Sequence, residues 1–552
     1  MSASDKKKLR KEQDASIITE RQKQERAEAK KLKIYTTVFV AALVLIACTA
    51  IAVLTVRGIN NSGVMQKNTV AATVGEEQLN SVEMSYYYND AINDFYSEMS
   101  SQYSEYASQY LEAIGLDNTK PLDEQIYDEE SGQTWAEYFL DEALKKAQND
   151  FALYKAATED SFTLPEEEQT TLDNQLNNLE TYATLYGFSN SKQYLRAMYG
   201  YGADAKSYGE YQERRAVADA YLTAHEEALT FDDAAIREQE AINPNKYTSF
   251  TYTSAYLSYT DFRQGGTEDE DGTVTYSDEE NNAAREAAKL AAEDMATATT
   301  VDELNEKVEA AEVNEDSQLA VNEYSDNLYT NINATLAQWL SDEERQEGDI
   351  EAIPNTSTTT DEEGNETTVT NGYYVAIFHS KNDNAKKMSN VRHLLVQFKG
   401  GETDETTGET TYTEAEMAEA KEAADGYLKQ WQEGDATEES FIELVKEHSD
   451  DTSAEEGGLF ENIHPDSEYV ENFLNWSISA DRKPGDAEVI ETEYGYHVMY
   501  YVGESETTYR DYMISNELRA TTQEEWYNGL IEATTATLGD TSKMKLDVMF
   551  PG

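Results

Sequence analysis

The chain has few of the residues that cross-link or stiffen a polypeptide. Its 552 residues include one cysteine and seven prolines. A single cysteine cannot form an intramolecular disulfide, so burial and hydrogen bonding must hold every domain together. Histidine is also scarce, and the six copies show no spacing typical of a metal site. We therefore expect neither a metal nor another cofactor.

Basic residues are the second deficit. The chain has 43 Lys and Arg against 109 Asp and Glu, which gives a formal net charge of −66. Such a surface repels phosphate groups and argues against nucleic acid as a partner. Tyrosine, in contrast, is abundant, with 38 copies. Its large ring and polar tip suit both helix packing and peptide-binding surfaces.

One long uncharged run occupies residues 34–56, and its 23 residues are enough to cross a bilayer as a helix. The preceding residues 1–33 carry 11 Lys and Arg against 6 Asp and Glu. The positive-inside rule therefore predicts a cytoplasmic N-terminal tail and an exported remainder. Cys48 lies inside the run, in a Leu-Ile-Ala-Cys sequence that resembles a lipobox. The residues after Cys48 stay apolar, which favours a plain membrane helix over lipidation.

Three ordered motifs lie between residues 391 and 502. They are VRHLLVQF at 391–398, LVKEHSDDTSAEEGGLF at 444–460 and VIETEYGYHVMYYV at 489–502. The first and last are typical of short strands, each with one histidine, and the middle one of a helix end followed by a polar loop. Together they resemble the parvulin family of peptidyl-prolyl cis-trans isomerases. The resemblance implies an α+β isomerase domain at residues 387–503 that acts on X–Pro bonds.

The same resemblance implies the site residues. His393 and His497 correspond to the paired imidazoles of the family, and Asp451 to the acid beside them. Asp450 is the neighbouring alternative, but the spacing to the paired glycines favours Asp451. The proline pocket is implied at Leu459, Tyr469, Phe473 and Tyr494. No basic pair follows the first strand, so we expect no selectivity for phosphorylated substrates.

A diverged copy of this region precedes it at a spacing of 136–140 residues. At this spacing 276–288 matches 412–424, and 338–353 matches 475–490. After a Thr/Glu/Asn-rich insertion around residues 355–370 of the first copy, 371–378 corresponds to 494–501. The chain is therefore predicted to hold two tandem parvulin-like modules, a first module at residues 245–386 and a second module at residues 387–503. The first module has Tyr256 in place of His393 and Tyr374 in place of His497, and it lacks the SDDTSA loop. We expect it to have the fold without the activity.

Residues 57–244 are predicted to be mainly helical. A short strand and a turn at Gly75 lead into a helix that Asn80 and Glu83 begin as a capping box. Further helices are expected at 135–157, 165–186, 191–198 and 206–229, with a last one at 508–532. This pattern resembles the chaperone domain of SurA- and PrsA-type foldases. The resemblance implies that residues 504–552 pack back on residues 57–244.

The fold class predicted is thus α+β, with an N-terminal transmembrane helix, a helical chaperone-like domain, two parvulin-like modules and a C-terminal helix. We interpret the chain as a membrane-anchored extracytoplasmic foldase, at a cell surface of Gram-positive type. Its expected partners are unfolded or newly exported polypeptides. The alternative is an inactive membrane-anchored holdase or surface-binding protein that keeps only peptide binding. The motif residues His393, Asp451 and His497 favour the enzyme.

Overall fold

The structure is a computed structural model, and it describes residues 4–6, 63–103, 106–268, 273–360, 366–403, 408, 410–548 and 550. The predicted membrane helix at 34–56, with Cys48, lies outside these residues. Within the described part, none of the helices combines the length and the apolarity needed to cross a bilayer. The chain forms two compact units: Phe231–Leu518 belong to one, and the described residues 63–230 together with Arg519 onward belong to the other.

The second of these units is mainly helical. Its elements are α3 (Val64–Asn68), β1 (Val70–Val74), β2 (Glu77–Asn80), α4 (Ser81–Tyr103), α5 (Ala107–Ala113), β3 (Ile126–Asp128), β4 (Gln133–Thr134), α6 (Trp135–Glu159), α7 (Glu166–Asn177), α8 (Leu179–Leu185), α9 (Ser191–Tyr199), α10 (Ala205–Ala228), the later part of α18 (Tyr509–Ala533) and β17 (Ala536–Leu538). Asn80 and Glu83 exchange the backbone hydrogen bonds of the predicted capping box at the start of α4. The last strand, β17, pairs with β1 in an antiparallel sheet of order β17-β1-β2.

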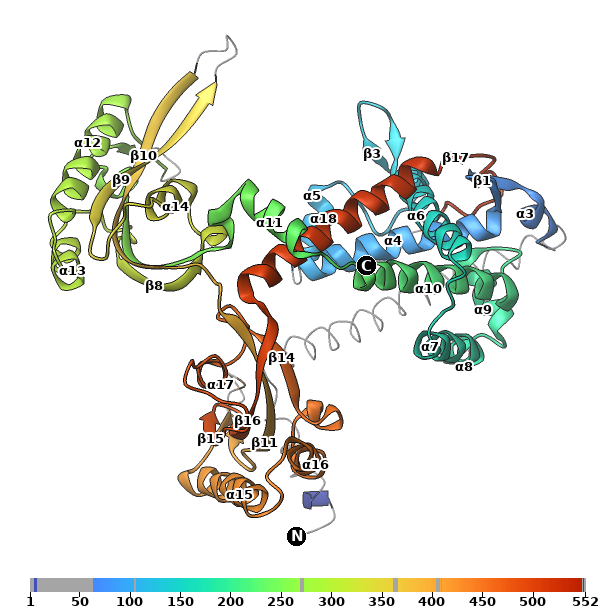
Figure 1. Cartoon of the computed structure of the whole chain (residues 1–552). Helices are drawn as coiled ribbons and strands as arrows, with labels where there is room; N and C mark the ends of the chain where they lie inside the picture. Colours follow the sequence, from blue (N-terminus) through green and yellow to red (C-terminus); the bar gives the residue numbers. More distant parts are fainter. Residues whose placement is uncertain are drawn as a thin grey trace. The chain divides into compact units, whose positions relative to one another are not determined.

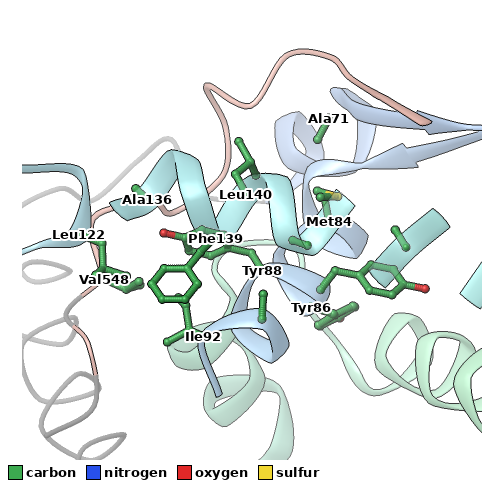
Figure 2. Packing of buried hydrophobic residues seen from close by; sticks show 14 of the residues in the cluster. Ala71, Met84, Tyr86, Tyr88, Ile92, Leu122, Ala136, Phe139, Leu140 and Val548 are labelled. Carbon is green, nitrogen blue, oxygen red and sulfur yellow. The ribbon is translucent and has the colours of Figure 1, made fainter. Parts of the chain in front are cut away.

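The tyrosines of α4 build the core of this unit. Tyr86, Tyr87 and Tyr88 are fully buried, and Figure 2 shows Tyr86 and Tyr88 among the side chains that pack with Phe139 of α6. Val548, near the end of the chain, packs into the same cluster. Much of the tyrosine surplus of this unit is therefore core. It buries large rings where a chain with no disulfide needs apolar contact.

The larger unit contains α11 (Asp233–Ile242), the first part of α18 and two four-stranded antiparallel sheets (Figure 1). The elements of the first module are β5 (Ser249–Ser258), β6 (Thr267–Glu268), β7 (Val274–Thr275), α12 (Asp278–Met295), α13 (Val301–Glu309), β8 (Val321–Leu328), α14 (Ala334–Leu340), β9 (Ile350–Thr360) and β10 (Glu366–Asn382). The elements of the second module are β11 (Lys387–Gln397), β12 (Glu402–Thr403), β13 (Thr410–Thr411), α15 (Glu414–Glu433), α16 (Glu438–His448), β14 (Leu459–Ile463), α17 (Glu471–Ser477), β15 (Ala487–Thr492) and β16 (Gly495–Thr508).

The two sheets have the same strand order. It is β8-β5-β10-β9 in the first module and β14-β11-β16-β15 in the second. In the first module α12 and α13 pack on one face of the sheet and α14 on the other (Figure 1). In the second, α15 and α16 pack on one face and α17 on the other. Each element of one module therefore has a counterpart of the same kind and order in the other.

Side-chain contacts repeat as well. The Trp339 indole donates to Glu351 at 2.6 Å, and the Trp476 indole donates to Glu488 at 2.9 Å. An arginine lies over each of these indole rings. Repetition at this level of detail is what a duplicated scaffold retains, because the buried indole needs its hydrogen-bond partner in both copies.

Two glycines show which residues of the two modules correspond to each other. A Cβ on Gly372 would lie 2.3 Å from the Leu257 carbonyl oxygen, and one on Gly495 would lie 2.1 Å from the Val396 carbonyl oxygen. Both glycines thus allow the same close approach of two strands, which a side chain would prevent. Leu257 therefore corresponds to Val396.

This register corrects one sequence-based equivalence. Counting back three residues from Leu257 and Val396 makes Ser254 the counterpart of His393. The strand pairing agrees, because His393 faces Met499 and Ser254 faces the equivalent Ala376. The assignment of Tyr256 to the His393 position was therefore wrong by two residues. A shift of two keeps a side chain on the same face of a strand, so the alternation of the sequence could not reveal it.

Candidate active site

The two histidines of the second module lie side by side on one face of its sheet. His393 is on β11 and His497 is on the neighbouring strand β16, where it faces Leu395. Their Nδ1 atoms are 2.8 Å apart, and the rings are nearly parallel with centroids 5.1 Å apart. Both residues are buried, with 2% and 4% of their surface exposed. The structure thus brings the two motif histidines into direct hydrogen-bond contact.

Asp451 is the carboxylate that approaches this pair. It caps the short 3-10 turn Thr452–Glu456, where its Oδ1 accepts from the Ser453 backbone N–H at 2.8 Å. The same oxygen lies 3.7 Å from Nε2 of His393. Asp450 instead accepts from the Gln397 backbone N–H and pairs with a lysine at the edge of the sheet. The geometry therefore distinguishes the two neighbouring acids.

The hydrogen bonds around the pair have a consistent direction when both imidazoles are neutral. The Ser453 hydroxyl donates to Asp451 at 2.6 Å, so only acceptor atoms face Nε2 of His393, which must carry the proton. Nδ1 of His393 then accepts from Nδ1–H of His497. Nε2 of His497 in turn accepts from the Thr492 hydroxyl at 2.8 Å. These tautomers follow from the network rather than from observed hydrogens.

Burial and neighbouring groups set the charges. The pKa of His497 lies well below its usual value, because burial and the adjacent His393 outweigh the attraction of Asp451. Burial alone would raise the pKa of Asp451. The hydrogen bond and charge of His393, together with the hydrogen bonds from Ser453, outweigh burial and hold that pKa well below its usual range. At neutral pH the site therefore holds a carboxylate close to a neutral His497.

Aromatic side chains form a wall beside the histidines. The ring centroid of Phe473, a buried residue of α17, lies 5.4 Å from that of His393 and 5.8 Å from that of His497. Tyr469 packs against Phe473 at 5.2 Å. Phe460 completes the group, with its centroid 5.0 Å from that of His393. These edge-to-face contacts leave an apolar surface next to the polar pair.

Leu459, predicted for this wall, lies on the other face of the sheet. It faces Arg392 across the strands, and the Arg392 side chain reaches Glu438 of α16. Directly opposed residues share a face and successive residues alternate, so Leu459 and His393 lie on opposite faces. The prediction was wrong by one residue, and Phe460 is the residue at the wall.

Tyr494 lies in the tight turn between β15 and β16. Its backbone N–H donates to the Thr492 hydroxyl at 3.2 Å, and its carbonyl accepts from the Phe398 N–H at 3.2 Å. The side chain is buried. The turn thus helps to hold the hydroxyl that orients His497. Sequence reasoning missed Thr492, Ser453 and Phe460, and only the pairing of β15 with β16 brings Thr492 to His497.

No group of three or more His, Cys, Asp or Glu side chains arranged to hold a metal ion occurs among the described residues. The site as described consists of two imidazoles, one carboxylate, two hydroxyl groups and an aromatic wall.

Comparison with known proteins identifies this part of the chain. Residues 375–504 match the family model of the PPIC-type PPIase domain. The match begins in β10, on the last strand of the first module, and covers β11, β14, β15 and most of β16 in the second. This stretch therefore belongs to the parvulin-type peptidyl-prolyl cis-trans isomerase domains.

Solved structures with partial similarity include the PPIase domain of TbPar42, at 24% identity and a TM-score of 0.16 over 21% of this chain and 98% of that one. PrsA from Bacillus anthracis is 23% identical, with a TM-score of 0.17, over 27% of this chain and 59% of that one. PrsA from Bacillus subtilis is 21% identical, with a TM-score of 0.17, over 27% and 48%. The chain thus matches only about half of the length of these PrsA structures. No curated protein matches the chain.

Proposed function

We propose that His393, Asp451 and His497 are the catalytic residues of the isomerase. The observation that carries this proposal is the 2.8 Å contact between the two imidazole Nδ1 atoms, with the Asp451 carboxylate 3.7 Å from the outer nitrogen. A buried carboxylate held ionised in this way has a strong field, because little water screens it. The two imidazoles position that field, and the low pKa of His497 keeps this imidazole neutral.

The field acts on the resonance that opposes rotation. An X–Pro bond resists rotation by ~18–20 kcal/mol because the carbonyl oxygen is partly negative and the nitrogen partly positive. A carboxylate near the carbonyl oxygen disfavours that charge separation and weakens the double-bond character of C–N. The twisted transition state has lost this resonance, so it is stabilised relative to both planar states. No covalent intermediate is required.

The prolyl ring is assigned to the aromatic wall. Phe460, Tyr469 and Phe473 offer ring edges and faces beside the histidines, and a pyrrolidine ring is apolar enough to pack there. Tyr494, in the turn before β16, remains a predicted substrate contact. The protein must hold the prolyl ring in place while the carbonyl of the preceding residue rotates past Asp451.

The test is prolyl isomerisation of a short X–Pro peptide by the full chain. We expect acceleration over the uncatalysed exchange, and a loss of roughly 100-fold in kcat/KM in His497→Ala, the size usual for a group that acts in the transition state. His379→Ala removes a histidine of the first module and serves as the matched control. Equal activity of both variants would refute the assignment, and a wild-type rate at background would refute the activity.

We further propose that the protein is anchored by residues 34–56 and acts outside the cytoplasm on unfolded or newly exported polypeptides. The charge asymmetry around the apolar run supports this orientation. Protease added to intact cells should degrade the modules and spare the tail at residues 1–33. Protection of the modules would place them inside and overturn the proposal.

The helical unit is proposed to hold unfolded polypeptides before or after isomerisation. Tyr106, Tyr127, Tyr182 and Leu185 are exposed on it. A surface that is strongly acidic and carries scattered apolar side chains can bind weakly without aggregating. Suppression of client aggregation by the full chain, compared with Tyr182→Ala and Leu185→Ala variants, tests this part. If the variants suppressed aggregation as well as the wild type, the holding activity would belong to another surface.

A further inference from the structure

The first module carries four tyrosines on the face that corresponds to the active-site face of the second. Tyr252 and Tyr256 are on β5, Tyr324 is on β8 and Tyr374 is on β10. Tyr256 faces Tyr374 and Tyr252 faces Tyr324 in the strand pairing, so all four side chains share one face. The ring centroids in each pair are 4.7 Å apart. We call this set the tyrosine face.

Two of the rings are held by hydrogen bonds, and three of the four remain accessible, whereas Tyr252 is buried. The Asn327 side chain donates to the Tyr252 hydroxyl, and the Asn355 side chain donates to the Tyr256 hydroxyl, both at 3.1 Å. Tyr324 is 37% exposed. Tyr256 and Tyr374 are half-buried. Preorganised aromatic rings lose little conformational freedom when a ligand binds.

The tyrosine face consists of four phenol side chains and no charged one, although Glu351 of β9, opposite Ala376, lies on the same face of the sheet. Among the described residues no charged side chain hydrogen-bonds to any of the four phenols. Burial raises the pKa of Tyr252 to about 12, and the ionisable neighbours that contribute are Tyr324 and Tyr374. For Tyr374 they are Tyr256 and Tyr324. An aromatic binding surface of this kind is complementary to a polypeptide segment that carries apolar rings and no charge.

The loop that covers the catalytic face of the second module runs elsewhere in the first. In the second module the Asp450 N–H donates to the Leu395 carbonyl, which draws the acidic loop over the histidines. The corresponding loop of the first module is fixed beyond the end of β5, where Asn314 donates to the carbonyls of Thr260 and Asp261. The first module therefore presents open rings where the second presents a carboxylate and two imidazoles.

We propose that the tyrosine face is a second, non-catalytic binding site for proline-containing segments of the polypeptide substrate, bound in extended polyproline II form. This inference rests on the proposed function of the second module, whose substrate is the same class of segment. Aromatic grooves recognise polyproline II because the conformation is preformed and its pyrrolidine rings pack against aromatic faces. With Ser254 and Tyr374 at the histidine positions and no loop that brings a counterpart of Asp451 to them, the bound X–Pro bond is held without isomerisation. One polypeptide held at two sites stays bound longer than at either alone.

The experiment uses the full chain and a peptide of repeated Ala-Pro that carries a photoreactive group. Cross-linked residues are mapped by mass spectrometry, and affinity is measured by fluorescence anisotropy. The variants are Tyr324→Ala, which changes a side chain at the surface, and Leu290→Ala as the control, at an exposed apolar residue of α12, the helix that packs on the other face of the same sheet. A peptide with every proline replaced by alanine tests the ligand, and one with tyrosine in place of proline tests a general aromatic preference.

We expect cross-links in both modules, with those in β5, β8 and β10 lost in Tyr324→Ala and an affinity at this site about fivefold weaker, as for an aromatic contact residue. Leu290→Ala should bind like the wild type. Cross-links confined to residues 387–503, equal binding of the proline-free peptide, or stronger binding of the tyrosine peptide would each overturn the proposal. Isomerase activity is measured on the same samples. Loss of first-module cross-links in Tyr324→Ala with no isomerase activity in any sample would refute the proposed function and leave the binding site standing.

Discussion

The two modules share a scaffold and differ in what the scaffold displays. Strand order, the Trp–Glu hydrogen bond and the glycine at the close strand contact are the same in both. The side chains at the position of the active site differ. His393 and His497 in the second module correspond to Ser254 and Tyr374 in the first. Packing constrains the positions that build the core, whereas the polar side chains of a site can change without loss of the fold. The comparison therefore separates residues that hold the module together from residues that do its chemistry.

The largest effect is expected where the modules are alike. Trp339→Ala and Trp476→Ala each remove a nearly buried indole together with its hydrogen bond to a carboxylate. Each should destabilise its own module by about 3–5 kcal/mol. Hydrogen exchange resolved by peptide would locate the loss to β8–β10 in the first case and to β14–β16 in the second. Trp339→Phe and Trp476→Phe are the milder controls. A large effect in only one module would show that the scaffolds are not equivalent.

The next effect separates the two neighbouring acids of the second module. Asp451→Ala removes the carboxylate next to His393 and should lower kcat/KM roughly 100-fold. Asp450→Ala removes a carboxylate that contacts Lys399 and the Gln397 N–H, and should change activity only a few-fold. Circular dichroism confirms that both variants are folded. If Asp450→Ala were the inactive one, the direction of the proposed field would be wrong.

A smaller effect concerns pH. Because the pKa of His497 is lower in the folded than in the unfolded state, the unfolded chain binds more protons below the unfolded pKa near 6.5. Stability therefore rises with pH in that window and is lost as pH falls below it, by up to about 1.4 kcal/mol per pH unit for one histidine. Burial also lowers the pKa of His464, which adds in the same direction.

The first module has Tyr374 in place of His497 and no proton to take up at that position between pH 7 and 5. Hydrogen exchange in β16 should accelerate over this range, after correction for intrinsic rates, more than exchange in β10. His497→Asn should reduce the difference. Equal acceleration in both strands of the wild-type protein would contradict the role of His497.

The sequence predicted the motif residues of the site better than it predicted which residues pair across the strands. His393, His497 and Asp451 were found because each lies in a motif with fixed neighbours, and Asn80 because a capping box is a local pattern. Ser254 and Phe460 were missed because an error of one or two residues in a strand changes no local signal. Thr492 was missed because its role exists only through strand pairing. Local chemistry could be predicted from the sequence, whereas contacts that depend on pairing could not.

The last prediction concerns a double variant of the first module that we expect to remain inactive. Ser254→His combined with Tyr374→His would place two imidazoles on the first module at the positions of the catalytic pair. The corresponding loop of the first module brings no carboxylate to these positions, because Asn314 fixes that loop past the end of β5. Without a carboxylate near the carbonyl oxygen, the imidazoles alone do not disfavour the charge separation of the amide. The double variant, measured in an Asp451→Ala background to silence the second module, should show no gain in kcat/KM. A gain would mean that paired imidazoles suffice, and that Asp451 serves only to orient them.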